Sequence, residues 1–313
     1  MSIDKIDGRP IIASVSGGKD STAMCLHLKE LGLDFVPVFM DTGWETAQTY
    51  QYVKEYLPKI VGEITWLRKD VELTEDLESI AQHYENRLGH YSAMVRICIK
   101  KGLFPSKMRR WCTERLKTEP MKEYLAGLDY EPVDAVGIRA AESVSRSKMP
   151  EWEWSDFFDC EIWRPLIKWS EQDVIDIHTK HGVRPNPGYL NGATRVGCWP
   201  CIYASKKELH HFSRDEERVS LLEDLEETIT ALGHARIEAR GEVPKYKRSG
   251  WFMDPAPKKD PKTGKRSGAH WPIRKVLEWA KTKRGGKQFE LFLPPERERG
   301  CMRWGLCDTG ADQ

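Results

Sequence analysis

The chain has 313 residues, 40% of them hydrophobic and 31% charged, with a net charge of +1, which suits a globular protein of one large domain or two smaller ones. No window of about twenty apolar residues occurs, and the amino terminus lacks the charged, apolar and cleavage regions of an export signal. We therefore expect a cytoplasmic protein that has no membrane partner.

Strand and helix patterns alternate over the first 170 residues. Runs of β-branched and aromatic residues predict strands at 11–16, 35–42, 63–68, 133–139 and 160–166. Amphipathic stretches predict helices at 20–31, 45–60, 73–87 and 113–127. Ser170, with Asp173 three positions later, marks the start of a further helix that ends at Gly182. This order predicts an α/β fold, with a parallel twisted sheet and helices on both faces.

The composition changes after this helix. The string "VRPNPGYLNGATRVGCWPC" is rich in Pro, Gly and Asn and predicts a loop, after which helical periods resume near residue 204 and again over 271–284. Residues 241–270 are polar and basic, and we expect them to be partly mobile. The sequence thus predicts a main domain over 1–205 and a helical, basic C-terminal extension over 206–313 that packs on it.

Positive charge is concentrated in residues 241–303, which hold seventeen Lys and Arg against seven Asp and Glu. Aromatic residues such as Tyr246 and Trp251 interleave with these cations. Stacking surfaces combined with cations are typical of nucleic-acid binding, so nucleic acid is a candidate partner. A solvated surface with no partner is the alternative interpretation.

The stretch "SVSGGKDST", residues 14–22, lies between the first predicted strand and the first predicted helix. Two adjacent glycines let the backbone turn its N–H groups into a concavity, and the helix adds its positive end. Lys19 supplies a mobile cation, and Ser16 and Ser21 supply hydroxyl groups. The sequence therefore predicts a phosphate-binding loop.

The string "SGGKDS" resembles the PP-loop, SGGxDS, of the ATP pyrophosphatase superfamily, whose fold is adenine nucleotide alpha hydrolase-like. Three further strings resemble motifs of its phosphoadenosine phosphosulfate (PAPS) reductase family, in order: "DTGWETAQTYQYV", "GIRAAESVSR" and "RPLIKWSEQDVIDIHTKHGVRPNPGYLNGATRVGCWPC". The resemblance covers about residues 10–205. It implies that ATP or another adenine nucleotide binds with Mg²⁺.

The resemblance also implies which residues hold the nucleotide. They are Ser16, Gly17, Gly18, Lys19, Asp20, Ser21, Asp41, Thr42, Gly43, Gly137, Arg139 and Ser143. Asp41 ends a predicted strand at the carboxyl edge of the sheet, where it could accept a hydrogen bond from the nucleotide or help to hold Mg²⁺. The expected catalytic residues are Lys19, Arg139 and Arg146, since ammonium and guanidinium groups neutralise phosphate charge.

Eight cysteines in a chain without an export signal are better explained as thiols, metal ligands or redox groups than as disulfides. "WCTERLKTEP" resembles the CCxxxKxEP stretch of iron–sulfur sulfonucleotide reductases, with Trp111 in place of the first cysteine and one residue more before the lysine. "GCWPC" matches their later CxxC. The resemblance implies a [4Fe–4S] cluster on Cys112, Cys198 and Cys201.

The fourth ligand must come from elsewhere. We expect Cys307, with Cys301, Cys98 and Cys160 as other candidates. Cys198, Cys201, Cys301 and Cys307 could instead form a tetrahedral zinc site, because thiolate ligands alone do not distinguish iron–sulfur from zinc.

The carboxyl-terminal tail departs from the family. Reductases carry an ECGLH segment whose cysteine attacks the sulfate sulfur, whereas this chain ends "RWGLCDTGADQ". The preferred hypothesis is therefore an ATP pyrophosphatase that adenylates an oxygen of a substrate such as nucleic acid, so that sulfur from a donor protein can replace that oxygen. Members linked to DNA phosphorothioation and tRNA thiolation follow this logic, and others occur in phages or beside CRISPR loci.

Two other hypotheses remain. The first is an APS or PAPS reductase that uses Cys301 or Cys307 as its nucleophile. The second is a non-catalytic accessory protein that binds nucleotide or nucleic acid.

Overall fold

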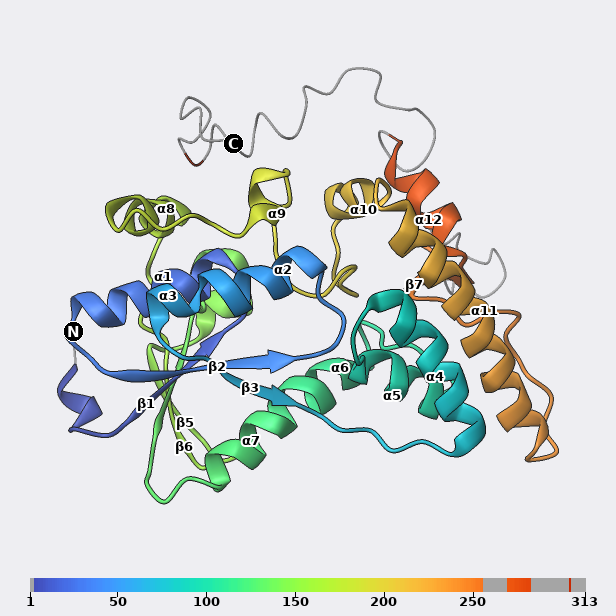
Figure 1. Cartoon of the computed structure of the whole chain (residues 1–313), viewed down its shortest axis with the longest axis horizontal. Coiled ribbons are helices and arrows are strands. Elements are labelled where there is room, and N and C mark those ends of the chain that lie inside the picture. Colours follow the sequence, from blue (N-terminus) through green and yellow to red (C-terminus); the bar gives the residue numbers. More distant parts are fainter. Residues whose placement is uncertain (1–2, 256–268, 283–303, 305–313) are drawn as a thin grey trace.

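The computed structural model describes residues 3–255, 269–282 and 304, and is built around one six-stranded sheet (Figure 1). The strand order is β3-β2-β1-β4-β6-β5, with bounds Thr65–Arg68, Phe35–Asp41, Ile11–Val15, Val133–Val136, Cys160–Trp163 and Trp152–Ser155. All neighbouring strands are parallel except β5, which is antiparallel to β6. The five predicted strands are confirmed, and β5 is an additional edge strand.

Helices cover both faces of this sheet, as expected. On one face, α1 (Lys19–Glu30) packs against α8 (Glu171–Lys180) and α3 (Pro58–Val61). On the other face, α7 (Glu119–Ala126) packs against β3. Successive residues of β1 point to opposite faces of the sheet. Ile11 packs in the core beside α1, and Ile12 packs in the core beside α7.

Two predicted helices contain π-helical turns. The helix expected over 45–60 consists of α2 (Ala47–Gln51), a π turn (Tyr52–Tyr56) and α3. The one expected over 113–127 consists of α6 (Trp111–Thr113), a π turn (Glu114–Thr118) and α7. The predicted capping box of α8 is confirmed, since the Asp173 N–H donates to Ser170 Oγ at 3.2 Å and the Ser170 N–H donates to Asp173 Oδ2 at 2.6 Å.

A helical layer stands beside the sheet, on the right in Figure 1. It buries one shared core and is formed by α4 (Glu75–Leu88), α5 (Ala93–Lys101), α10 (Lys206–Phe212), α11 (Glu216–Glu238) and α12 (Ile273–Ala280). The sequence analysis missed α5, whose cap is the Ser92 hydroxyl, which accepts the Val95 N–H at 3.2 Å. The layer joins the C-terminal extension to helices of the main domain. The division at residue 205 stays a prediction.

Part of the segment expected to be mobile forms ordered structure. Its described ends contain β7 (Phe252–Met253) and β8 (His270–Trp271), which pair in antiparallel fashion. The Glu226 carboxylate of α11 accepts the Trp251 and Ile273 N–H groups, each at 2.9 Å, and thereby holds both chain segments on α11. The rest of the segment, residues 256–268, lies outside the described residues.

Within the described ranges, no helix has both the length and the apolar character needed to cross a membrane.

The centre of the sheet contains a buried carboxyl group, Asp134 of β4. Burial raises its pKa to about 7, whereas an Asp in an unfolded chain titrates near about 3.9. Between these values the folded protein keeps a proton that the unfolded chain has lost, so this group makes stability fall as the pH rises from about 4 to about 7. We expect Asp134→Asn to remove that slope. In urea unfolding, the stability of the variant relative to wild type should increase by about 3 kcal/mol from pH 5 to pH 8; an unchanged difference would contradict this.

Candidate functional site

The predicted phosphate loop connects β1 to α1 at the carboxyl edge of the sheet. Gly17 has a φ of +70°, a left-handed conformation that glycine adopts without a steric penalty. The Ser16 N–H donates to Ser21 Oγ at 3.1 Å, and the Ser21 hydroxyl donates to the Gly18 carbonyl at 3.0 Å. Ser21 is buried and holds the loop together, while Ser16 is exposed at its rim. Of the two expected hydroxyl donors, Ser16 is thus the one that a ligand can reach.

Lys19 is the first residue of α1 and its side chain is 9% exposed. Its Nζ lies 3.4 Å from Glu171 Oε1 and 3.6 Å from Asp20 Oδ2. The same ammonium lies 5.0 Å from the centre of the Tyr189 ring, and the Tyr189 hydroxyl accepts the Lys19 N–H at 3.2 Å. Residues of α8 and α9 (Pro187–Leu190) thus position a cation beside the phosphate loop.

The end of β4 meets the same loop. A Cβ at Gly137 would come within 2.9 Å of the Asp20 carbonyl oxygen, so the two segments are in direct contact. The Arg139 guanidinium is buried in an ion pair with Asp20. From β1 the chain continues to β2 and β3 on one side, whereas β4 lies on the other side of β1. Open α/β sheets bind ligands at such a switch point, beyond the carboxyl ends of the two strands.

Among the described contacts of Ser143 and Arg146, none is with the loop. Both lie in short turns after β4, where the Ser143 hydroxyl accepts the Arg146 N–H at 3.2 Å. Arg146 is partly exposed and forms an ion pair with Glu142. The structure therefore brings Arg139 to the loop directly, and the roles of Ser143 and Arg146 stay predictions.

A carboxylate pair lies at the end of β2. Asp41 Oδ1 accepts the Gly43 N–H at 2.9 Å and the Tyr50 hydroxyl at 2.7 Å. The Tyr50 hydroxyl also lies 3.0 Å from Glu45 Oε2, and burial together with these two carboxylates raises the Tyr50 pKa. Thr42 donates to Glu45 Oε1 at 2.8 Å. The predicted Asp41, Thr42 and Gly43 thus belong to one hydrogen-bonded group with Glu45.

Three cysteines gather around Lys117. Cys198, Glu45, Cys201 and Cys112 all raise the pKa of the Lys117 ammonium, with Cys198 the largest influence. Cys198 Sγ lies 3.6 Å from Thr42 Oγ1 and 3.8 Å from Glu45 Oε1, which connects the cysteines to the end of β2. Burial raises the pKa of Cys198 to about 12 and also raises that of Cys112, so both are thiols at neutral pH.

The donor set fits a thiolate-bound metal group in its chemistry. Cys112, Cys198 and Cys201 supply sulfur, and Lys117 supplies a positive charge beside them. Cys98 interacts with Cys112 and is a fourth thiol at this place, whereas Cys160 lies beside Asp134. Cys301 and Cys307 are outside the described residues. Among the described side chains, no three His, Cys, Asp or Glu groups converge as closely as a bound ion requires.

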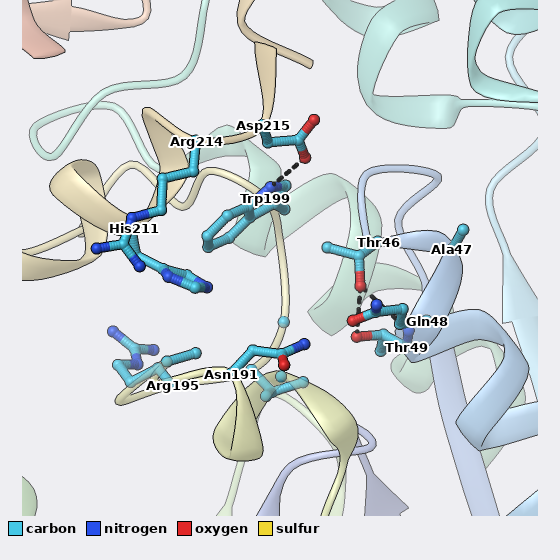
Figure 2. A pocket seen from close by; sticks show the side chains of 14 residues that line it. Thr46, Ala47, Gln48, Thr49, Asn191, Arg195, Trp199, His211, Arg214 and Asp215 are labelled. Carbon is cyan, nitrogen blue, oxygen red and sulfur yellow. Dashed lines mark hydrogen bonds between the residues drawn. The ribbon is translucent and has the colours of Figure 1, made fainter. Parts of the chain in front are cut away.

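Two cavities meet at this edge of the sheet. The smaller, of about 180 Å³, is lined by Ser16 of the phosphate loop and by Lys117, Cys198 and Cys201. The larger, of about 580 Å³, is shown in Figure 2. Its walls include Thr46 and Thr49 near α2 on one side, and Arg195, Trp199, His211 and Arg214 on the other. Arg195 lines both cavities.

The described residue of the carboxyl-terminal tail, Trp304, packs at the same site. It is 7% exposed, and its ring centre lies 5.3 Å from that of His178 and 6.1 Å from that of Tyr189. Since Tyr189 also contacts Lys19, Trp304 packs on a residue that borders the phosphate loop.

The sequence analysis missed Glu45, Lys117, Tyr189, Arg195 and Trp304. Lys117 lies in the same quoted string as Cys112. Tyr189 and Arg195 lie in the quoted string that contains Cys198. These positions could therefore have been singled out. Glu45 and Trp304 also lie within quoted strings, but their roles depend on tertiary contacts, with Thr42 and with Tyr189 respectively.

Comparisons with known proteins agree with the motifs. Residues 10–204 match the family described as phosphoadenosine phosphosulfate reductase domain. A protein of Escherichia phage 186, described as an uncharacterized 37.8 kDa protein in gpa 5′region, is 30% identical over 95% of this chain and 96% of its own length. The adenosine 5′-phosphosulfate reductase of Allochromatium vinosum is 31% identical over 48% of this chain and 61% of its own length, so less than two thirds of that reductase is matched. The PAPS reductase of Candida auris, solved as a phosphate complex, covers 61% of this chain and 82% of its own at 16% identity, with a TM-score of 0.44.

Proposed function

Since the chain belongs to the phosphoadenosine phosphosulfate reductase family, we propose that it is an enzyme that binds ATP at its phosphate loop and adenylates a second substrate. An oxygen of that substrate forms a bond to the α-phosphorus, and the bond between the α-phosphorus and the bridging oxygen breaks. Pyrophosphate leaves with the electron pair. A sulfur nucleophile from a donor protein can then displace AMP from the activated position, and a nucleic acid is the acceptor that we favour.

The observation that carries this proposal is the shared cavity. Ser16 of the phosphate loop lines the same space as Cys198 and Cys201. A nucleotide phosphate on the loop would therefore lie beside cysteine sulfur, which is the arrangement that activation followed by sulfur transfer needs.

Positioning and charge neutralisation would supply most of the catalysis. Lys19 and the loop N–H groups would hold the phosphates, and Arg195 stands where the two cavities join. The ion pair with Asp20 would keep Arg139 oriented at the loop. Asp41 is the carboxylate that would help to hold Mg²⁺, which, when bound, neutralises phosphate charge.

The tail supports adenylation over sulfate reduction. When the Gly-Leu pairs of ECGLH and "RWGLC" are aligned, Trp304 takes the place of the reductase cysteine. An indole cannot attack sulfur as a thiolate does. Trp304 is nevertheless packed beside Tyr189 at the phosphate loop. We infer that this position contributes no nucleophile to the reaction.

One experiment separates the three hypotheses. The purified protein is incubated under anaerobic conditions with ATP and single-stranded oligonucleotide, and separately with APS or PAPS and thioredoxin. Pyrophosphate release in the first reaction, without sulfite release in the second, supports adenylation. Sulfite release supports a reductase, and the absence of both products supports an accessory protein.

We also propose that Cys112, Cys198 and Cys201 hold a [4Fe–4S] cluster, with a fourth ligand from Cys307 or Cys98. When bound, such a cluster would supply electron-transfer or sulfur-handling chemistry. After anaerobic reconstitution we expect about four irons per chain in the wild type and a loss of most of that iron in Cys112→Ser and Cys201→Ser.

Iron content and visible absorbance measure this outcome without an activity assay. Cys160→Ala is the matched control, because Cys160 lies beside Asp134, and it should retain the iron. Comparison of Cys98→Ala with Cys307→Ala identifies the fourth ligand. Stoichiometric zinc in place of iron would contradict the cluster.

A further inference from the structure

A third cavity, lined by cationic side chains, lies among the helices beside the sheet. It has a volume of about 570 Å³ and is formed by the end of α5, the loop 102–109, the last turns of α11 and residues 246–253. Among the described residues that line it, none is Asp or Glu and five are cationic: Lys101, Arg109, Arg236, Arg240 and Arg248. It shares no lining residue with the two cavities at the phosphate loop.

Most of these cations lack a partner within the described part of the chain. Lys101, Arg109 and Arg240 are exposed and form no ion pair there. Arg248 lies 3.9 Å from Glu227, at the limit of an ion pair. Arg236 donates through Nη2 to the Ile99 carbonyl at 2.9 Å, but its Nη1 is buried without a hydrogen-bond acceptor. The cavity thus carries surplus positive charge, while the unpaired Nη1 of Arg236 is buried away from solvent.

Helix ends offset only a small part of this surplus positive charge. α5 and α11 both end at the cavity, and a helix carboxyl end carries roughly half a negative charge. The two ends therefore offset about one of the five cations. Burial and the nearby Arg240 both lower the pKa of Arg236, as expected for a cation among cations. An anionic ligand would relieve this repulsion.

The rim of the cavity is apolar. The side chains of Met108 and Met253 are 87% and 40% exposed, and the Tyr246 ring forms part of the wall. Cations beside exposed apolar and aromatic side chains suit a ligand that has both phosphates and flat bases.

The positive surface continues from the cavity toward the cysteines. Lys107, next to Met108, places its ammonium 5.8 Å from the centre of the Tyr203 ring. Tyr203 is exposed, and its N–H donates to Cys201 Sγ at 3.5 Å. The loop 105–110 therefore lies beside both the cavity and the cysteine loop, so a strand held in the cavity could extend along it toward the cysteines.

We propose that this cavity binds the phosphate backbone of a single-stranded nucleic acid. A cavity of this volume admits one or two nucleotides with their bases, whereas a duplex would present only phosphates on a convex surface. The proposal goes beyond adenylation, because binding here requires no ATP. It adds cations that precede the basic segment 241–303, namely Lys101, Arg109, Arg236 and Arg240, to the surface expected from composition, whose role stays a prediction.

The test is fluorescence anisotropy of a labelled mixed-sequence DNA oligonucleotide, titrated with full-length protein over a range of salt concentrations and without ATP. The Arg109→Gln/Arg240→Gln double variant removes two exposed cations that have no ion pair. We expect its affinity at 0.1 M salt to fall by at least about tenfold. The slope of log affinity against log salt should decrease by about 1.4, or about 0.7 per phosphate contact.

The matched control is the Lys59→Gln/Lys168→Gln double variant, which removes two exposed charges elsewhere and should bind as wild type does. Three outcomes of these titrations would overturn the proposal, and a competition experiment adds a fourth. They are equal binding by the cavity variant and wild type, equal loss in the control, and duplex of the same sequence binding as tightly as the single strand. Displacement of the oligonucleotide by an equimolar amount of AMP would also overturn it, because the cavity would then be a site for a small anion.

Discussion

Lys19→Ala should lower ATP-dependent pyrophosphate release by at least about a hundredfold, because removing one charged donor at developing phosphate charge costs about that much. The variant should still fold. Without Lys19, Asp20 keeps its ion pair with Arg139, and the Glu171 side chain is 39% exposed and can be solvated. Release of pyrophosphate, measured with a coupled phosphate assay at saturating ATP, gives the comparison.

The matched control is Lys29→Ala, on the same helix. Lys29 is exposed and donates to the Ile60 carbonyl, at the end of α1 that lies away from the loop. Loss of this lysine changes the charge of α1 by the same amount and should leave pyrophosphate release within about twofold of wild type. If both variants lose activity equally, or if neither does, then the phosphate loop is not where ATP reacts.

The α/β fold was predictable because each part of it has a local signal. Strand β1, the glycines after it and helix α1 follow one another within residues 11–30, and the capping box at Ser170 fixes the start of α8. Strand β5 was missed because it is a four-residue edge strand whose polar residues, such as Glu153, face solvent. Helix α5 was missed because it has only nine residues and because the burial of Arg96 within it depends on tertiary ion pairs with Glu78 and Glu85.

The candidate site was predictable where one motif holds all of its parts, as in Ser16–Ser21. It was not predictable where the chemistry depends on which side chains the fold places next to one another. Burial of Lys117 among three cysteines is a contact between α6, the π turn that follows it, and a loop some eighty residues later. Likewise, the positive cavity combines the ends of α5 and α11, which are far apart in the sequence. Neither group of residues forms a local pattern.

Gly43→Ala should lower the free energy of unfolding by roughly 3–5 kcal/mol. Gly43 has a φ of +71°, and an added Cβ would lie 2.4 Å from Ser92 Cα and 2.8 Å from the Ala93 nitrogen. These are backbone atoms at the start of α5, so neither can rotate away. The same contact includes two hydrogen bonds, from the Ser92 hydroxyl to the Gly43 carbonyl at 2.6 Å and from the Met94 N–H to the Thr42 carbonyl at 3.0 Å.

Gly89→Ala separates the steric clash with α5 from the cost of a left-handed backbone conformation. Gly89 has a φ of +74°, but an added Cβ would meet nothing within 4 Å, so only the left-handed backbone is penalised, at about 1 kcal/mol. Urea unfolding of both variants should therefore show a difference of several kcal/mol between positions of almost equal φ. Equal destabilisation would mean that α5 can move away from Gly43. A larger loss at Gly43 would mean that the helical layer beside the sheet holds Thr42, and through it Cys198, in place at the candidate site.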